Sequence, residues 1–384
     1  MDSPSPEPSE IVPTPVIAAP RGPAIRRLTA VDTARGFFML VILAGHAAAN
    51  LDKSPPSREL EAILSPLFTS GTVGFTLISG VLLGSFAAAR ADMGPVLRRY
   101  REQGIRLLLV AHPLIAVALY LPLHRPEDGP LRFFLLRHYM TDLLAVIFLA
   151  FAPLVPRMRP HVRLGAGVAL MVVHRLLDAS SALRARPWLL ARELLSGVDF
   201  HSQDRVLIEN YPFLNILGMF LIGTFLGDMV GRAQKSGDLR GQSRRFVTYS
   251  MLTPLLALPL LGAWRGFKVG FLPDRESLFR TALYPDREGS LFPIYLSLVL
   301  AVLGLALGRD ASGRAPRWIE ERVQVLGKTS LFTYVAQYYL VQTIPCLLGF
   351  EHDVSVAFWV VWTIGSILGL FGLSTLWNRY VKKV

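Results

Sequence analysis

Residues 28–50 read LTAVDTARGFFMLVILAGHAAAN, an apolar stretch interrupted by the ionisable residues Asp32, Arg35 and His46. A run of about 20 apolar residues is what a helix needs to cross the hydrocarbon core of a bilayer. Lipid offers no partner to an unpaired backbone amide, so such a run must be helical. The stretch therefore predicts a membrane-spanning helix over residues 31–50.

Similar apolar runs recur along the whole chain of 384 residues, of which 52% are hydrophobic and only 18% charged. A soluble chain usually carries about 25% charged residues. We therefore predict an all-α, polytopic integral membrane bundle with about ten transmembrane helices. The predicted spans are 31–50, 66–88, 105–123, 139–156, 162–178, 212–231, 247–264, 290–308, 329–349 and 354–378.

The distribution of positive charge predicts the orientation of the chain. If the N-terminus is cytoplasmic, the inside segments hold 24 of the 40 Lys and Arg residues and the outside segments hold 14. Cytoplasmic loops normally carry this excess. We expect a multi-pass protein of the cell membrane with both termini in the cytoplasm. The net charge of +12 is then a topology signal, and we expect the bilayer and not a nucleic acid as its partner.

Two domains of unequal size are expected. Residues 1–27 are rich in Pro and Ser and predict a disordered cytoplasmic tail, without the pattern of a cleavable signal peptide. Residues 28–384 form the membrane domain.

The single cysteine, Cys346, excludes an intrachain disulfide. No metal-binding or common hydrolase motif occurs in the sequence, so no metal site is predicted.

The first span carries the candidate catalytic residues. Arg35 and His46 are 11 residues apart, which places them within about 20° of one helical line and roughly 16 Å apart along the axis. Asp32 lies about 40° from that line. One stripe thus carries Asp32, Arg35 and His46 and ends at an imidazole expected deep in the membrane. Alternatively, Asp32 forms a capping box with Thr29, Arg35 extends to the interface, and His46 is a packing residue.

The second span and the loop after it carry the candidate ligand-binding residues. Ser79 and Gly80 lie in GTVGFTLISGVLLGSF, where they can line a cavity near His46 or serve helix packing. The loop RRYREQGIRLLL brings Arg98, Arg99 and Arg106 together. These arginines are either ordinary topology charge or a site for the phosphates of a nucleotide cofactor.

Weaker candidates stand elsewhere in the spans. The ninth predicted span has a polar face with Gln337, Tyr338, Tyr339 and Gln342. Residues 188–195 in the long outer loop read as an amphipathic interfacial helix. The remaining candidates are His112, His138, Asp142, His174, Arg175 and Asp178.

Four stretches together resemble the transmembrane acyltransferases, which include acyltransferase family 3, the heparan-glucosaminide N-acetyltransferases and the glucan succinyltransferases. The Arg-x10-His spacing of Arg35 and His46 is similar to their first span, and the Ser79–Gly80 pair to their second. The other two stretches are YPFLNILGMFLIGTFLGD (211–228) and LGKTSLFTYVAQYYLV (326–341). The sequence departs from family 3 at Gln337, where members often have histidine.

The resemblance implies transfer of an acyl group, expected to be acetyl, from cytoplasmic acyl-CoA to a glycan or lipid-linked sugar outside. His46 would be the catalytic histidine, and Arg35 would support the acyl donor. Acyl-CoA would be a co-substrate, with no cofactor bound permanently. A transporter or flippase explains polar groups inside spans equally well but does not call for the Arg-x10-His stripe. A sensor or scaffold has no positive feature in the sequence.

Overall fold

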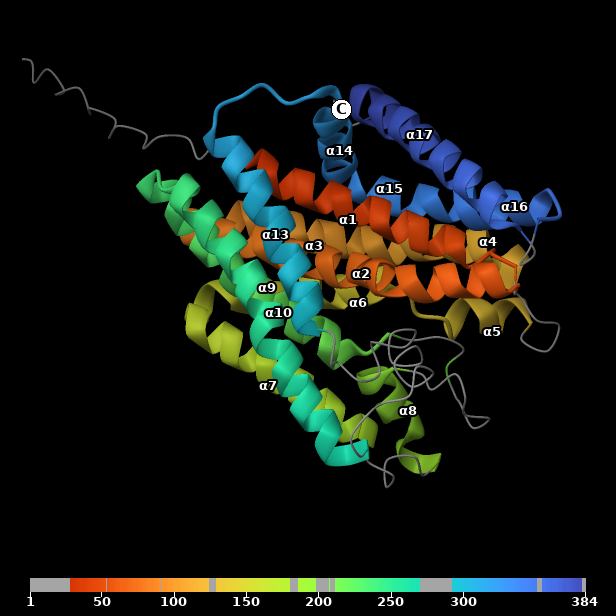
Figure 1. The fold of residues 1–384 in the computed structure, drawn as a ribbon, viewed down its shortest axis with the longest axis horizontal. Helices are drawn as coiled ribbons and strands as arrows, with labels where there is room; N and C mark the ends of the chain where they lie inside the picture. The colour runs from red at the N-terminus through yellow and green to blue at the C-terminus, as the bar shows by residue number, and fades with distance from the viewer. Residues whose placement is uncertain are drawn as a thin grey trace, which may run out of the picture.

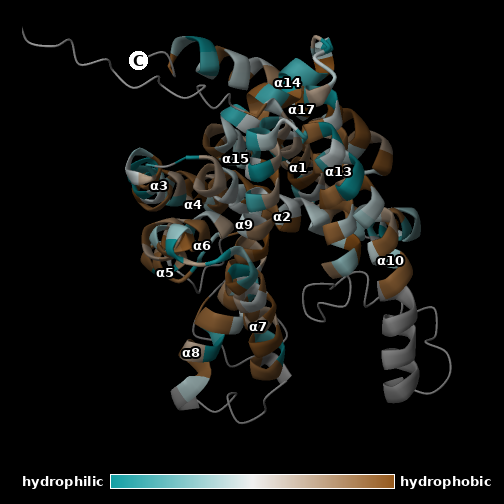
Figure 2. Cartoon of the chain, turned by 90° about the vertical axis from the view of Figure 1, so that its left-hand side faces the viewer, coloured by the Kyte–Doolittle hydropathy of each residue, from teal (hydrophilic) through white to brown (hydrophobic). Residues whose placement is uncertain are grey.

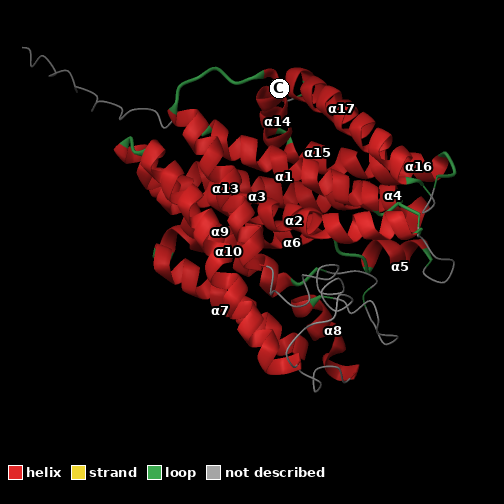
Figure 3. Cartoon of the chain, in the orientation of Figure 1, coloured by secondary structure: helices red, strands yellow, loops and turns green. Residues whose placement is uncertain are grey.

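The computed structural model describes residues 28–52, 54–90, 92–123, 129–179, 186–197, 207, 211–269, 292–350 and 354–381. Figure 3 shows that the named elements of this part of the chain are helices, as predicted. The predicted tail, 1–27, and most of the outer loop 265–289 lie outside the described residues. The all-α prediction is confirmed.

Seven helices of the described part are long and apolar enough to cross a membrane. Two of them run through short π-helical or 3₁₀ segments without a break. They are α1 (Thr29–Ala48), α2 (Pro55–Ala89), α3–η1–α4 (Gly94–Leu123), α6–η2–η3 (Met140–Arg157), α9 (Phe213–Ser236), α13 (Phe292–Ala311) and α17 (Val356–Tyr380).

The other three predicted spans are also helical and lie outside these seven. They correspond to α7 (Pro160–Ala179), α10 (Leu239–Val269) and the series α15 (Ser330–Tyr338), η5 (Tyr339–Thr343) and α16 (Ile344–Leu347). The last series carries the buried amides Gln337 and Gln342, which lower its hydropathy. Each of the ten predicted spans therefore overlaps a helix or a helical series of the described residues.

Helices α1 and α2 lie at the centre of the bundle, and neighbouring helices cover them (Figure 1). Helix α9 packs along α2 at very close range. A Cβ atom added at Gly80 would overlap the Phe220 carbonyl oxygen, and one added at Gly84 would overlap the Thr224 carbonyl oxygen. From the other side, Gly227 meets the backbone of Val81. Small residues allow such backbone contact, which drives helix association in lipid.

The short helix α14 (Trp318–Lys328) crosses the first turns of α1 in the same way. A Cβ at Gly36 would overlap the Val323 carbonyl oxygen, and one at Gly327 would overlap that of Asp32. The predicted capping box between Thr29 and Asp32 is wrong, because α1 has no side-chain cap of its own. Instead, Asp310 at the end of α13 accepts from the Thr29 hydroxyl and from the Ala30 amide, the latter at 2.7 Å.

The outer surface of the bundle is apolar, as a lipid-facing surface requires. Val361, Ile364 and Leu368 of α17 are exposed, as are Val117 and Leu121 of α4. Brown, apolar residues recur along the helices in Figure 2, with teal and white residues among them. Outside the spans, α8 (Arg186–Ser196) forms where the amphipathic helix was predicted. Its residues Trp188, Leu190 and Leu194 are exposed, while Arg192 and Glu193 are buried.

Candidate active site

Arg35 lies one and a half turns into α1 and points into the bundle. Its side chain is only 8% exposed. Its Nη2 atom donates to the Ser79 hydroxyl at 3.3 Å, and its guanidinium carbon lies 4.9 Å from the centre of the Phe75 ring. Guanidinium groups favour such aromatic faces. Ser79, which the sequence analysis expected near His46, is therefore in direct contact with Arg35.

A narrow cavity opens beside Arg35, where five helices meet. Its polar lining comes from Arg35, Gln103 of α3, Thr141 of α6, and Ser330 and Tyr334 of α15. Phe75 of α2 forms part of the apolar wall. The π-helical segments η1 (Leu107–Ala111) and η2 (Ile147–Phe151) also contribute to the lining, through Leu107 and Phe148. π-Helical turns are frequent at functional sites.

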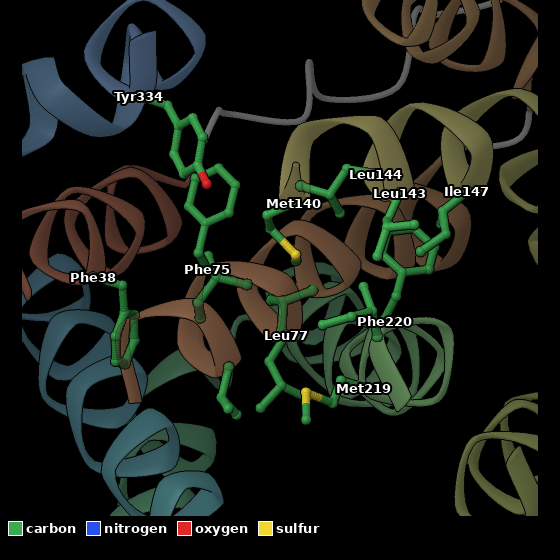
Figure 4. Packing of buried hydrophobic residues seen from close by; sticks show 14 of the residues in the cluster. Phe38, Phe75, Leu77, Met140, Leu143, Leu144, Ile147, Met219, Phe220 and Tyr334 are labelled. Carbon is green, nitrogen blue, oxygen red and sulfur yellow. The ribbon is translucent and has the colours of Figure 1, made fainter. Parts of the chain in front are cut away.

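Aromatic rings connect the Arg35 cavity with His46. Phe75 and Tyr334 stack at 6.1 Å between ring centres, and Figure 4 shows the two rings side by side. The hydroxyls of Tyr334 and Tyr338 share a hydrogen bond of 3.2 Å. The Tyr338 ring then lies 4.7 Å from the His46 imidazole. We call the series Phe75, Tyr334 and Tyr338 the aromatic path.

His46 lies in the last turn of α1 and is half-buried. The sequence placed it deep in the membrane, but the structure places it near the end of a helix about 30 Å long. Its backbone oxygen accepts from Gln342 Nε2 at 2.9 Å. Its Nδ1 atom is buried and has no hydrogen-bond partner among the described residues. The Nδ1 nitrogen is thus open to a ligand or a proton, while Gln342 holds the backbone of His46.

The loop that follows His46 is fastened to the ninth predicted span. Asn50 Nδ2 donates to the Val341 carbonyl of η5 at 2.6 Å, and Leu51 forms a β-bridge with Val354. Next to it, the Ser54 hydroxyl donates to Asp52 at 2.6 Å, and this hydrogen bond lowers the pKa of the Asp52 carboxyl. The first two contacts hold the end of α1 against η5 and the segment before α17.

Gln337 is fully buried beside the aromatic path. Neither its amide nitrogen nor its amide oxygen has a hydrogen-bond partner in the described structure. Leaving a buried polar group unpaired costs about 1–3 kcal/mol. Such a group is what a polar substrate would satisfy, so Gln337 joins His46 as a candidate binding residue.

The other predicted site residues lie in different places. Gly80 faces the backbone of α9, so its lack of a side chain is explained by packing and not by a cavity. Asp32 is 3% exposed and lies where α1 crosses Gly327 of α14. It is not among the residues that line the Arg35 cavity. The three predicted catalytic residues therefore share a helix, but only Arg35 and His46 are joined by the aromatic path.

The predicted donor-binding arginines lie on α3 (Gly94–Arg106), and Arg98, Arg99 and Arg106 are all exposed. Arg99, Gln103 and Arg106 follow one another at spacings of four and three residues, so they share one face of the helix. Gln103 reaches the Arg35 cavity, whereas the arginines do not line it. Their role in binding the donor stays a prediction. Arg99 and Arg106 lie on the same helix face as Gln103, which lines the cavity.

Two of the weaker candidates form a pair that sequence reasoning did not join. His112 Nδ1 lies 2.9 Å from Asp142 Oδ2, and His112 Nε2 lies 3.1 Å from the Phe134 carbonyl oxygen. The Tyr139 amide donates to the same Asp142 oxygen. The pair therefore ties α4 to the start of α6.

The sequence analysis did not identify Phe75, Gln103 and Tyr334 as site residues. The spacing of four residues between Tyr334 and Tyr338, which places both on one face of a helix, was the available signal.

These features define a multi-pass helical membrane protein whose first span carries a buried arginine and a histidine joined by a path of aromatic and polar groups. Residues 28–377 match the family model described as an acyltransferase domain, that of acyltransferase family 3. The match covers nearly the whole chain, so the chain belongs to this family and is a membrane acyltransferase. None of the curated proteins and none of the solved structures gives a significant match.

Proposed function

We propose that the enzyme moves an acyl group, expected to be acetyl, from cytoplasmic acyl-CoA to a hydroxyl of a glycan or lipid-linked sugar outside. The observation that carries this proposal is the aromatic path between Arg35 and His46. These residues are about 16 Å apart along α1, so the two ends of the path serve different depths of the membrane. A donor entering at one end and an acceptor at the other fit this arrangement.

Arg35 is the residue proposed to receive the donor. A buried guanidinium that contacts Ser79 and Phe75 is held in position beside the cavity, where its positive charge can attract an anionic or carbonyl oxygen. The thioester arm of the donor would extend along the aromatic path, whose flat apolar faces suit it. Gln337 would satisfy its buried amide by hydrogen bonding to the arm.

His46 is proposed to act as the general base. The acceptor hydroxyl gives its proton to the imidazole as its oxygen attacks the thioester carbonyl. The carbon–sulfur bond then breaks, and the CoA sulfur takes the proton from the imidazolium. The new ester leaves with the acceptor, and His46 returns to its neutral form.

The test is His46→Gln, which retains volume and hydrogen bonding but cannot act as a base at neutral pH. We expect acyl transfer per folded protein to fall by about 10²- to 10⁴-fold, the usual contribution of general-base catalysis. Activity and thermal stability should be measured on the same preparation, because a packing histidine would lower the second. His161→Gln, an exposed histidine of α7, is the matched control. Near-normal specific activity of His46→Gln would contradict the proposed role.

A further inference from the structure

A second pocket lies away from the aromatic path, between the end of α2 and the facing parts of η3 (Ala152–Arg157), α7 and α9. Five charged residues line it, four of them arginines and one an aspartate: Arg157, Arg159, Arg163, Asp228 and Arg232. This basic pocket has a cavity volume of about 250 Å³. Its lining includes Ala87, which lies 12 residues beyond Phe75 on α2, or about 18 Å along the helix axis.

Arg163 forms the base of the basic pocket and is 2% exposed. It donates to the Thr224 carbonyl at 3.1 Å and to Asp228 Oδ1 at 3.2 Å. Its Nε atom is buried and has no hydrogen-bond partner among the described residues. A buried charged group with an unused donor is costly unless a ligand satisfies it.

Asp228 cannot neutralise the pocket. It is shared by two arginines, since its Oδ2 atom also lies 2.6 Å from Arg232 Nε. Arg157 and Arg159 are exposed and have no ion-pair partner within the described part of the chain. Three positive charges are therefore left uncompensated around one cavity.

The position of the basic pocket is consistent with the predicted cytoplasmic surface. Its arginines come from 157–163 and from Arg232 at the start of 232–245, two segments that the charge distribution places inside. Anionic headgroups of the cytoplasmic leaflet attract basic residues at this depth. Arginine also binds phosphate oxygens through paired N–H groups.

We propose that the basic pocket binds a phosphate group of an anionic ligand, with Arg163 at its base and Arg157, Arg159 and Arg232 around its rim. The phosphate belongs either to a lipid headgroup or to the CoA part of the donor. The proposal of a phosphate site is independent of the proposal that acyl-CoA is the donor, because the charges and the cavity favour a phosphate group from either source.

The experiment uses the full-length protein in phosphatidylcholine nanodiscs. One arm adds a small fraction of phosphatidylglycerol and measures its retention by native mass spectrometry. The other arm titrates acetyl-CoA in discs without the anionic lipid. The test variant is Arg157→Gln/Arg159→Gln, and the matched control is Arg240→Gln/Arg244→Gln, two exposed arginines of α10 outside the pocket.

We expect the test variant to lower the affinity for one of the two ligands by about tenfold or more. Each arginine near an anionic surface contributes about 1 kcal/mol to binding. The control should remain within about twofold of the wild type. Loss of lipid alone identifies a headgroup site, and loss of acetyl-CoA affinity alone identifies the donor's phosphates. Unchanged binding of both ligands in the folded variant would overturn the proposal. If lipid retention falls while the wild type binds no acetyl-CoA, the site stands and the proposed donor fails.

Discussion

At the scale of single residues, Arg35 is held by two kinds of contact at once. Its Nη2 atom donates to Ser79, and the face of its guanidinium lies over Phe75. A planar group with several donors can make both contacts at once. A lysine would retain the charge without this geometry.

For Arg35, we predict that Arg35→Ala lowers acetyl-CoA affinity or turnover by about tenfold or more, as the loss of a charge-assisted hydrogen bond does. Arg35→Lys should recover only part of the loss. Binding and turnover measured in nanodiscs check this, with Arg58→Ala of α2 as an exposed control. Affinity and turnover both at wild-type levels in Arg35→Ala would remove this residue from the site.

The relative positions of site residues on one helix could be predicted from the sequence, whereas contacts between residues of different helices could not. The helical period places Arg35 and His46 on one line of α1. The helical period does not predict that Phe75 and Tyr334 lie between Arg35 and His46, because the positions of these two rings depend on how α2 and α15 pack. The same reason explains Asp310, which caps α1 from 280 residues away along the chain.

At the scale of elements, α2 packs along α9 and also carries Ser79 and Phe75, which contact Arg35 of α1. The two helices touch through backbone atoms at Gly84 and Gly227. Gly80 was a candidate for the ligand site as well as for packing, because the sequence alone is compatible with either a cavity or a helix contact beside Ser79.

We therefore predict that Gly84→Leu separates α2 from α9 and destabilises the protein. The added side chain would overlap the Thr224 carbonyl, which belongs to backbone and cannot move aside. Overpacking of a well-packed core costs about 1–3 kcal/mol or more. A lower melting temperature and lower yield of monodisperse protein would show the effect. Gly365→Leu in α17 is the control, since no atom lies within 4 Å of its added Cβ. Equal stability of the two variants would argue against the crossing.

At the scale of the whole molecule, hydropathy predicted the class of fold because lipid permits so few alternatives to a helix. It was less informative for α7 and for α15–η5–α16, which carry buried polar groups such as His174 and Gln337.

The orientation of the molecule is a prediction of the charge distribution. We expect reporters fused after Arg232 and after Lys383 to remain cytoplasmic and one inserted near Ser202 to be outside, because 24 Lys and Arg residues lie in the inside segments and 14 in the outside segments. Cysteine-accessibility labelling at the same positions gives an independent readout. A cytoplasmic Ser202 would overturn both the span number and the loop assignment.

The three π-helical segments η1, η2 and η5 have a consequence for comparing this chain with others of its family. A π turn closes its hydrogen bonds over five residues and not four, so it holds one residue more than an α turn. A relative that lacks that residue would keep the helix on both sides, and an ungapped alignment would rotate every later position by about 100°. Insertions and deletions between relatives therefore belong inside Leu107–Ala111, Ile147–Phe151 and Tyr339–Thr343, and not only in the loops.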